Sequence, residues 1–198
     1  MAMKKNLRSL CVTAIMGAIG TVLMYLEFSV PFMPAFIKVD FSEIPALITA
    51  FALGPWYGVL VCLIKNLLHL FVTNSLFIGE LSNFILGAVF VGVAGIIYQR
   101  KKTRNNAFFA CLISTVVMTL ISLVSNYYIV YPLYAETFLW PMSSIIAMYQ
   151  AIFPKVDNLW ECLIIFNLPF NFIKGAVNAL ICFAVYKKIS PLLHGKLH

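Results

Sequence analysis

The sequence predicts an all-α integral membrane protein, built as one compact bundle of six transmembrane helices. Of its 198 residues, 62% are hydrophobic and only 11% are charged, and the mean hydropathy of +0.95 is far from that of an ordinary soluble domain. At roughly 20 residues per span, a chain of this length has room for about six spans and their loops. No linker divides it, so residues 1–198 are expected to form a single domain.

Uncharged apolar runs, separated by charges and helix breakers, define the expected helices. The second run is interrupted by Gly54-Pro55. Proline cannot continue a helix at that point, so a short helix is expected before it and a full helix after it. The six expected helices cover residues 8–27, 43–53, 56–74, 80–99, 105–133 and 160–188, and an outer loop covers residues 28–42.

The charges predict the orientation of this bundle. Ten of the 14 Lys and Arg residues lie in three segments, Lys4, Lys5 and Arg8, then Arg100, Lys101, Lys102 and Arg104, then Lys187, Lys188 and Lys196. Six spans place these segments on one side, which the positive-inside rule makes cytoplasmic, together with both termini. The seven acids fall at or near the outer face: Glu27, Asp40, Glu43, Glu80, Glu136, Asp157 and Glu161. The formal charge of +7 therefore reflects membrane orientation, and no nucleic-acid partner is expected.

Several classes of function are disfavoured by what the sequence lacks. It has no G-x-x-x-x-G-K-[ST] phosphate loop, so the chain is not expected to hydrolyse ATP. Neither H-E-x-x-H nor G-x-S-x-G occurs, and two of the three histidines lie in the C-terminal tail, so we expect no enzyme, no cofactor and no metal site. A stand-alone secondary transporter would need a coupling-ion site and internal repeats, and neither is evident.

The last apolar run carries a polar stripe in "FNLPFNFIKGAVNAL". Asn167, Asn171, Lys174 and Asn178 are spaced by four, three and four residues, which places them within an arc of roughly 60° on an α-helix. A lysine near the middle of a membrane helix costs on the order of 3 kcal/mol, so Lys174 indicates a functional cavity. Asn167 and Asn178 fit such a cavity or, equally, hydrogen bonds between helices.

Other polar residues lie in the outer halves of the expected helices. Thr115, Thr119, Ser122 and Asn126 repeat the same spacing, although such hydroxyls commonly bond the backbone of their own helix. Lys65 is too deep to reach the membrane surface easily, and it either pairs with an acid or faces the same cavity. Further polar side chains follow on the third and fourth helices: Asn66, His69, Thr73, Glu80, Ser82 and Asn83.

The first outer loop, "EFSVPFMPAFIKVDFSE", has an extended pattern. Pro31 and Pro34 forbid a regular helix. In the segment that follows, Phe36, Lys38 and Asp40 alternate with Ile37, Val39 and Phe41. The loop is interpreted either as a lid over the outer mouth or as a solvated loop that interfacial Phe side chains anchor.

Four separated segments resemble one known family. The stretches "LEFSVPFMPAFIKVDFSEIPALITAFALGPWYGVLVCLIKNLLHL", "GELSNFILG", "NYYIVYPLY" and "LPFNFIKGAVNA" are similar to the riboflavin-binding substrate (S) component of energy-coupling-factor (ECF) vitamin transporters, RibU type. The resemblance covers residues 10–186. It implies a six-helix bundle in a prokaryotic cell membrane that binds riboflavin near its outer face and docks on a transmembrane coupling protein with two ATPase subunits. An S component for thiamine, biotin or folate is the alternative.

The resemblance also implies roles for individual residues. Its ligand contacts would fall on Lys38, Val39, Asp40, Phe41, Glu80, Asn83, Asn126, Asn171 and Lys174. Ala14 and Ala18 match its A-x-x-x-A docking pattern on the first helix, because small residues one turn apart let a partner helix approach closely, although packing within the bundle is the other interpretation. Residues 134–163 match the family least well and are expected to form a longer outer loop.

Overall fold

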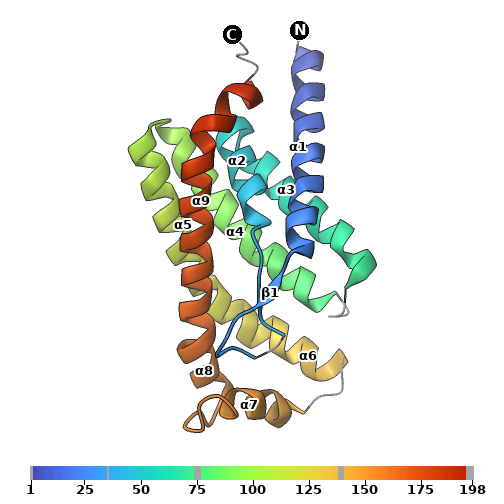
Figure 1. Ribbon diagram of the computed structural model, residues 1–198, viewed down its shortest axis with the longest axis vertical. Helices are drawn as coiled ribbons and strands as arrows, with labels where there is room; N and C mark the ends of the chain where they lie inside the picture. Colours follow the sequence, from blue (N-terminus) through green and yellow to red (C-terminus); the bar gives the residue numbers. More distant parts are fainter. Residues whose placement is uncertain (1, 35, 74–76, 138–140, 195–198) are drawn as a thin grey trace.

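The computed structural model describes residues 2–34, 36–73, 77–137 and 141–194, which form an elongated helical bundle (Figure 1). Two short strands form a hairpin in which Phe28 pairs with Val39 and Ser29 with Lys38. The elements are α1 (Ala2–Tyr25), β1 (Phe28–Ser29), β2 (Lys38–Val39), α2 (Glu43–Leu53), α3 (Pro55–His69), the 3₁₀ turn η1 (Leu70–Val72), α4 (Ile78–Arg100), α5 (Arg104–Ser125), the π-helical turn η2 (Asn126–Val130), α6 (Tyr131–Thr137), α7 (Met142–Gln150), α8 (Leu159–Cys162), the π-helical turn η3 (Leu163–Asn167) and α9 (Leu168–His194).

The bundle has the dimensions of a membrane protein. Within the described residues, five helical stretches are long and apolar enough to cross a bilayer: Asn6–Tyr25, Pro55–Val72, Ile78–Arg100, Arg104–Thr137 and Leu159–Val185. The apolar helix α2 has only 11 residues, or about 16 Å of rise, roughly half of the hydrocarbon thickness. It occupies the half of the bundle nearest the chain ends, and the β1–β2 hairpin fills the other half (Figure 1).

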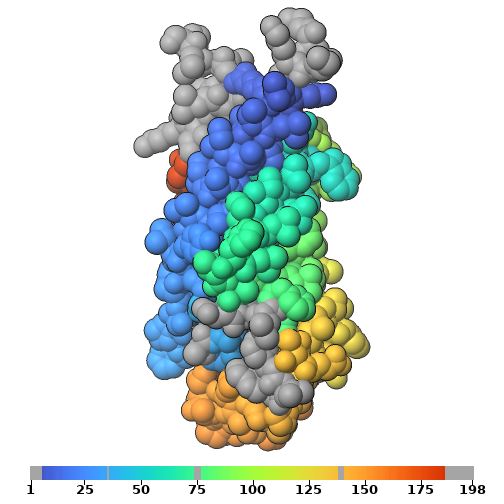
Figure 2. Space-filling model, turned by 90° about the vertical axis from the view of Figure 1, so that its right-hand side faces the viewer, coloured from blue at the N-terminus to red at the C-terminus, as the bar shows by residue number. Residues whose placement is uncertain are grey.

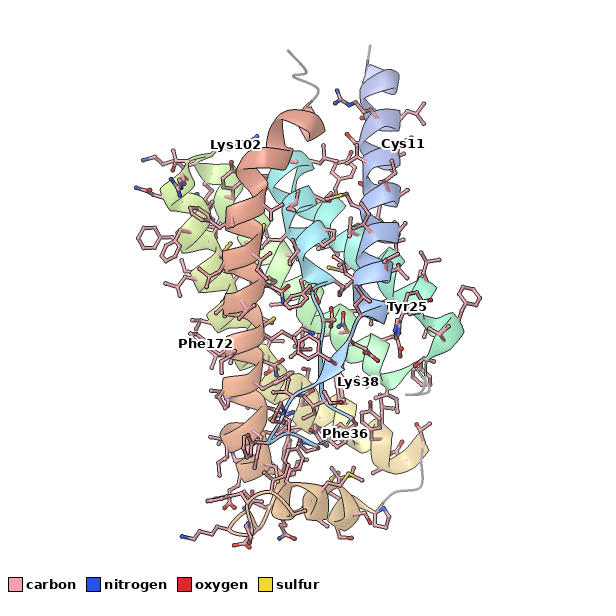
Figure 3. The ribbon with its side chains drawn as sticks, viewed as in Figure 1. Cys11, Tyr25, Phe36, Lys38, Lys102 and Phe172 are labelled. Atoms are coloured by element: carbon pink, nitrogen blue, oxygen red, sulfur yellow. The ribbon has the colours of Figure 1, made fainter. Side chains whose placement is uncertain are left out.

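Both chain ends lie at one end of the bundle, beside the turn between α4 and α5 that carries Lys102 (Figures 1 and 3). The opposite end is formed by α6, α7 and α8. The positive-inside rule assigns the end with the basic turn to the cytoplasm. Lys196 lies outside the described residues.

Two apolar clusters hold the helices together. The first joins α2, α3, α4, α5 and α9, with Leu47, Val61 and Phe90 among its buried members. The second lies at the end formed by α6–α8 and includes Ile145, Tyr149 and Leu163. The segment between α6 and α8, expected to be a loop, therefore contains a helix because α7 buries one apolar side against the bundle.

Two prolines account for the two π-helical turns. These turns lie within residues 105–133 and 160–188, where the sequence predicts regular helices. Pro132 lies two residues after η2, and Pro169 lies two residues after η3. A proline removes the hydrogen bond to the carbonyl four residues earlier and its ring crowds that carbonyl. Those carbonyls belong to Tyr128 and Ile165, in the middle of each π-helical turn, so the wider turn accommodates the proline without ending the helix.

The packing of α3 on its neighbours predicts a steric cost at Gly58. A Cβ atom there would lie 2.5 Å from Val91 Cγ1 and 2.8 Å from the Ala46 carbonyl oxygen. Gly58→Ala is therefore expected to lower the free energy of unfolding, measured by titration with a denaturing detergent, by about 1–3 kcal/mol. In the matched control Gly92→Ala, the nearest atom would be 3.6 Å away, and stability should be unchanged or higher. Equal stability of the two variants would contradict the packing described.

Candidate functional site

Two adjoining cavities open within the half of the bundle that holds the hairpin. The inner cavity, of about 140 Å³, is lined by Phe36, Ile37, Lys38, Glu43, Gly79, Ser82, Asn83, Leu86, Phe90, Met118, Asn126, Val130, Tyr131, Tyr134, Asn167, Phe170, Asn171, Lys174, Gly175 and Asn178. The mouth cavity, of about 460 Å³, is lined by Met24, Tyr25, Glu27, Phe36, Lys38, Asp40, His69, Val72, Thr73, Gly79, Glu80, Asn83 and Tyr134. Five residues line both: Phe36, Lys38, Gly79, Asn83 and Tyr134. The two cavities therefore adjoin each other across these five residues.

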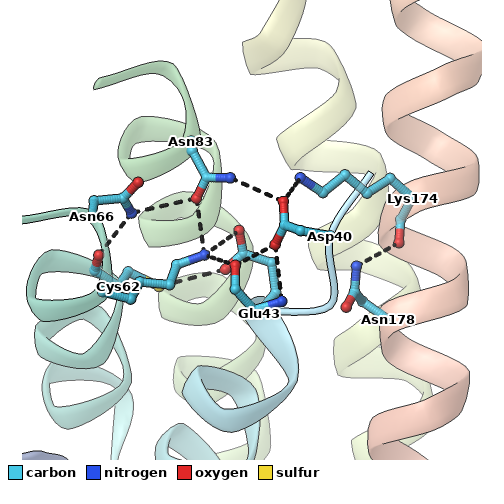
Figure 4. Close-up of polar contacts among 9 residues, drawn as sticks. Asp40, Glu43, Cys62, Asn66, Asn83, Lys174 and Asn178 are labelled. Carbon is cyan, nitrogen blue, oxygen red and sulfur yellow. Dashed lines mark hydrogen bonds and ion pairs between the residues drawn. The ribbon is translucent and has the colours of Figure 1, made fainter. Parts of the chain in front are cut away.

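An ion pair between Lys174 and Asp40 closes one side of this site (Figure 4). The Lys174 Nζ atom lies 2.9 Å from Asp40 Oδ2, and it joins α9 to the end of the hairpin. Asp40 also accepts hydrogen bonds from the backbone and side chain of Ser42 and from Asn83 Nδ2. Burial opposes ionisation of the Asp40 carboxyl, but Lys174 and Lys65 hold its pKa well below the usual range. Asp40 is therefore an ionised anchor for the hairpin.

A second buried ion pair lies behind the first. Lys65, which is fully buried, has its Nζ atom 2.9 Å from Glu43 Oε1 and 2.9 Å from Asn83 Oδ1, and it also donates to Ser42 Oγ. Lys65 thus pairs with an acid, one of the two arrangements that the sequence allowed. The Asn83 amide joins both pairs, because its other end donates to Asp40 (Figure 4). Two acids and two lysines therefore form one buried cluster, hereafter the charge cluster: Asp40, Glu43, Lys65 and Lys174.

The polar stripe of the last helical stretch, hereafter the α9 stripe, begins at Asn167 at the end of η3, continues on α9 and faces the inner cavity. Asn167, Asn171, Lys174 and Asn178 all line this cavity. Asn167 also links helices, because it forms hydrogen bonds with Tyr149 and Tyr131. Asn171 Nδ2 donates to Ser122 Oγ on α5. Asn178 Nδ2 donates to the Lys174 carbonyl oxygen, whereas its buried Oδ1 has no hydrogen-bond partner. The side chains of the stripe thus form hydrogen bonds within the bundle and also present polar groups to the inner cavity.

The second polar stripe divides into two parts. The Thr115 and Ser122 hydroxyls donate to carbonyls of their own helix, at Cys111 and Thr119, as helix-facing hydroxyls commonly do. Asn126, at the start of η2, lines the inner cavity, and its side-chain amide has no hydrogen-bond partner among the residues that the structure describes. Of this stripe, Asn126 is the member that lines the inner cavity, and the buried Thr119 hydroxyl has no hydrogen-bond partner in the described part of the chain.

The remaining residues that the resemblance singled out lie in three places. Lys38 lines both cavities and pairs with Glu27. Glu80 lines the mouth cavity, where its Oε1 lies 2.8 Å from His69 Nδ1. The side chains of Val39 and Phe41 do not line either cavity: they face an apolar groove of about 480 Å³ between the hairpin and α9. The groove adjoins the charged site at Lys174 and Asn178, which line both the groove and the inner cavity.

Aromatic side chains of the inner cavity were not identified from the sequence. Phe36 of the hairpin meets Tyr131 and Tyr134 of α6, at ring-centroid distances of 6.2 Å and 6.0 Å. Phe36 and Lys38 lie close together in the half of the molecule that holds α6 (Figure 3). Pro132 is the feature of the sequence that could have indicated these tyrosines. The π-helical turn before it rotates the following residues relative to Asn126, so that Tyr131 and Tyr134 line the same cavity as Asn126.

The comparisons with known proteins agree with this architecture. A sequence profile of the family "ECF transporter, substrate-specific component" matches residues 8–186. The chain is 31% identical over 191 residues to a riboflavin transporter RibU of Staphylococcus aureus, covering 96% of this chain and 94% of the relative. It is 29% identical to the riboflavin transporter FmnP of Bacillus subtilis, covering 94% of each. A solved structure, described as that of the S component of a bacterial ECF transporter, is similar with a TM-score of 0.75 and 30% identity, over 96% of this chain and 98% of that one.

The charge cluster predicts a large effect of removing one charge. Lys65→Met leaves Glu43 buried without its cation, and it is expected to lower the free energy of unfolding by about 3–5 kcal/mol. Adding Glu43→Gln should restore most of this loss, because the orphaned charge is then gone. The measurement is denaturing-detergent titration, and Lys102→Met, at an exposed position, is the control. A double variant no more stable than Lys65→Met would contradict the pairing.

Proposed function

We propose, from the premise that this chain belongs to the family of ECF transporter substrate-specific components, that it is the riboflavin-binding subunit of such a transporter. The family is a substrate-binding component of a membrane transporter, and the chain is a multi-pass membrane protein of that kind. Riboflavin is proposed as the ligand because the curated relatives from S. aureus and B. subtilis are named riboflavin transporters. The chain itself is proposed to bind without catalysis, the energy for uptake coming from partner ATPases.

One observation carries the proposal: the α9 stripe, the hairpin and α6 converge on a single cavity with two chemical characters. Phe36, Tyr131 and Tyr134 give one part of the wall aromatic surface, which suits a flat isoalloxazine ring. Asn126 and Asn171 offer amides that can donate and accept hydrogen bonds, and ribityl hydroxyls and ring carbonyls need such partners.

The proposed contacts follow from this arrangement. The polar groups within reach of a ligand that spans both cavities are Asn126, Asn171 and Lys174 of the inner cavity, Lys38 and Asn83, which line both cavities, and Asp40 and Glu80 of the mouth cavity. Because the side chains of Val39 and Phe41 face the groove on the other side of the hairpin, a contact from these two residues would be made by their backbone. We add Asn178, whose buried Oδ1 lacks a donor, since a ligand N–H would satisfy it.

The surface of α1 supports docking on a transmembrane partner. Ala14 and Ala18 are exposed, and α1 lies along one face of the bundle beside α3 (Figure 2). Gly17 lies on the adjacent face of the same helix and packs against α3, because a Cβ atom there would lie 2.6 Å from Ile64 Cγ2. Gly17 thus allows α1 to pack closely on α3 inside the bundle, whereas the small side chains of Ala14 and Ala18 allow another helix to approach α1 from outside. We propose that this surface docks the coupling protein that carries the two ATPase subunits.

Riboflavin binding by the purified protein tests the proposed function. Titration of the detergent-solubilised chain is expected to quench flavin fluorescence without ATP, metal or partner. Lys174→Ala and Asn171→Ala should each weaken binding by about 10- to 100-fold, since a lost hydrogen bond to a buried ligand costs on the order of 1–3 kcal/mol.

Lys155→Ala, at an exposed position on the outer side, is the matched control and should bind like the unmodified protein. Absence of quenching by the unmodified protein would refute the riboflavin assignment. Normal binding by both α9 variants would instead move the ligand away from the inner cavity.

Replacement of an α1 alanine separates binding from assembly. Ala14→Trp is expected to leave riboflavin affinity within about twofold, because its side chain faces away from both cavities, while co-purification with the partner subunits and riboflavin uptake fall at least about tenfold. Val124→Trp, at an exposed site on α5 across the bundle from α1, should affect neither. An intact complex with Ala14→Trp would place the docking surface on another helix.

A further inference from the structure

Tyr149 of α7 is the largest fully buried side chain of the described residues, although α7 lies at the outer end of the bundle (Figure 1). Its ring packs against Phe166, with centroids 5.1 Å apart, and edge-on against Phe36 of the hairpin at 6.2 Å. Tyr149 does not itself line either cavity. Through its contact with Phe36, Tyr149 connects the segment between α6 and α8 to a residue that lines both cavities.

The Tyr149 hydroxyl belongs to a closed ring of three hydrogen bonds. It donates to Asn167 Oδ1 at 2.8 Å, and Asn167 Nδ2 donates to the Tyr131 hydroxyl at 3.1 Å. The third contact joins the two tyrosine hydroxyls. Since the single proton of Tyr149 is already directed to Asn167, Tyr131 must donate to Tyr149. Each member thus donates once and accepts once within the ring, and the orientation of all three groups is fixed.

This ring joins the two proline-linked π-helical turns. Tyr131 directly follows η2, and Asn167 is the last residue of η3. Both side chains line the inner cavity. Asn167 in turn orients the next polar residue of the stripe, because its carbonyl oxygen accepts a hydrogen bond of 2.9 Å from Asn171 Nδ2. The ring of hydrogen bonds therefore holds the two π-helical turns to each other and to α7.

We propose that Tyr149 is a positioning residue for the ligand site, and that α7 acts as a brace which fixes Tyr131, Asn167 and through them Asn171. The inference rests on the proposed riboflavin-binding function. It gives the segment between α6 and α8 a role in affinity without contact with the ligand. Burial raises the pKa of the Tyr149 phenol, so the hydroxyl keeps at neutral pH the proton that the ring requires.

A double-mutant cycle on riboflavin affinity tests the brace. Tyr149→Phe removes one hydroxyl, and with it two bonds of the ring, while it keeps the buried aromatic ring. It is expected to weaken riboflavin binding about tenfold, mainly through faster dissociation. In an Asn167→Ala background the same change should cost less, about two- to threefold, because one of the two groups through which Tyr149 acts is gone and only its contact with Tyr131 remains.

Tyr128→Phe, on the neighbouring turn but 70% exposed, is the matched control and should bind like the unmodified protein. A purely structural role of Tyr149 would lower thermal stability and leave the affinity, measured well below the melting temperature, unchanged, and this result would overturn the proposal. An equal loss in both backgrounds would also overturn it. If Asn167→Ala binds too weakly to measure, Tyr131→Phe supplies the second background under the same criteria. Loss of binding by the unmodified protein would refute the proposed function instead.

Discussion

The hairpin keeps its place because of the buried ion pair between Asp40 and Lys174. The two residues are 134 positions apart in the chain, and their contact ties the irregular segment after α1 to the last helix. Asp40 and Lys174 also join the Lys65–Glu43 pair through Asn83, so the hairpin, α2, α3, α4 and α9 meet in one charge cluster. An unpaired charge at this depth would cost several kcal/mol, and each member of the cluster is therefore required by the others.

Two prolines determine how the helices on either side of the cavity present their side chains. In a regular helix, Asn126 and Tyr131 would point in directions about 140° apart, because five residues at about 100° each leave that offset. The wider turn at η2 reduces the offset, and both residues line the inner cavity. Pro169 stands in the same relation to η3 and Asn167. The site is thus formed where the regular helices are interrupted. π-Helical turns are frequently found at functional sites.

The bundle and its polar stripe could be predicted from the sequence, because hydropathy, charge bias and helical periodicity are properties of neighbouring residues. Those patterns identified the membrane class, and the spacing of Asn167, Asn171, Lys174 and Asn178 predicted a common face that the structure shows lining one cavity. The partner of Lys65 could not be chosen, since Glu43 is close to it only after α2 folds back on α3. The role of Tyr149 could not be predicted from the sequence either, because its ring of hydrogen bonds joins three segments far apart in the chain.

The composition of the charge cluster has an electrical consequence. Two carboxylates and two ammonium groups cancel, so the four charges of this cluster sum to zero. A single uncompensated charge carried across a bilayer exchanges about 2.3 kcal/mol with each 100 mV of membrane potential. A neutral cluster exchanges none. The displacement of this cluster along the membrane normal, empty or with an uncharged vitamin beside it, therefore does no net work against the voltage of the cell, and its energetics are independent of the membrane potential.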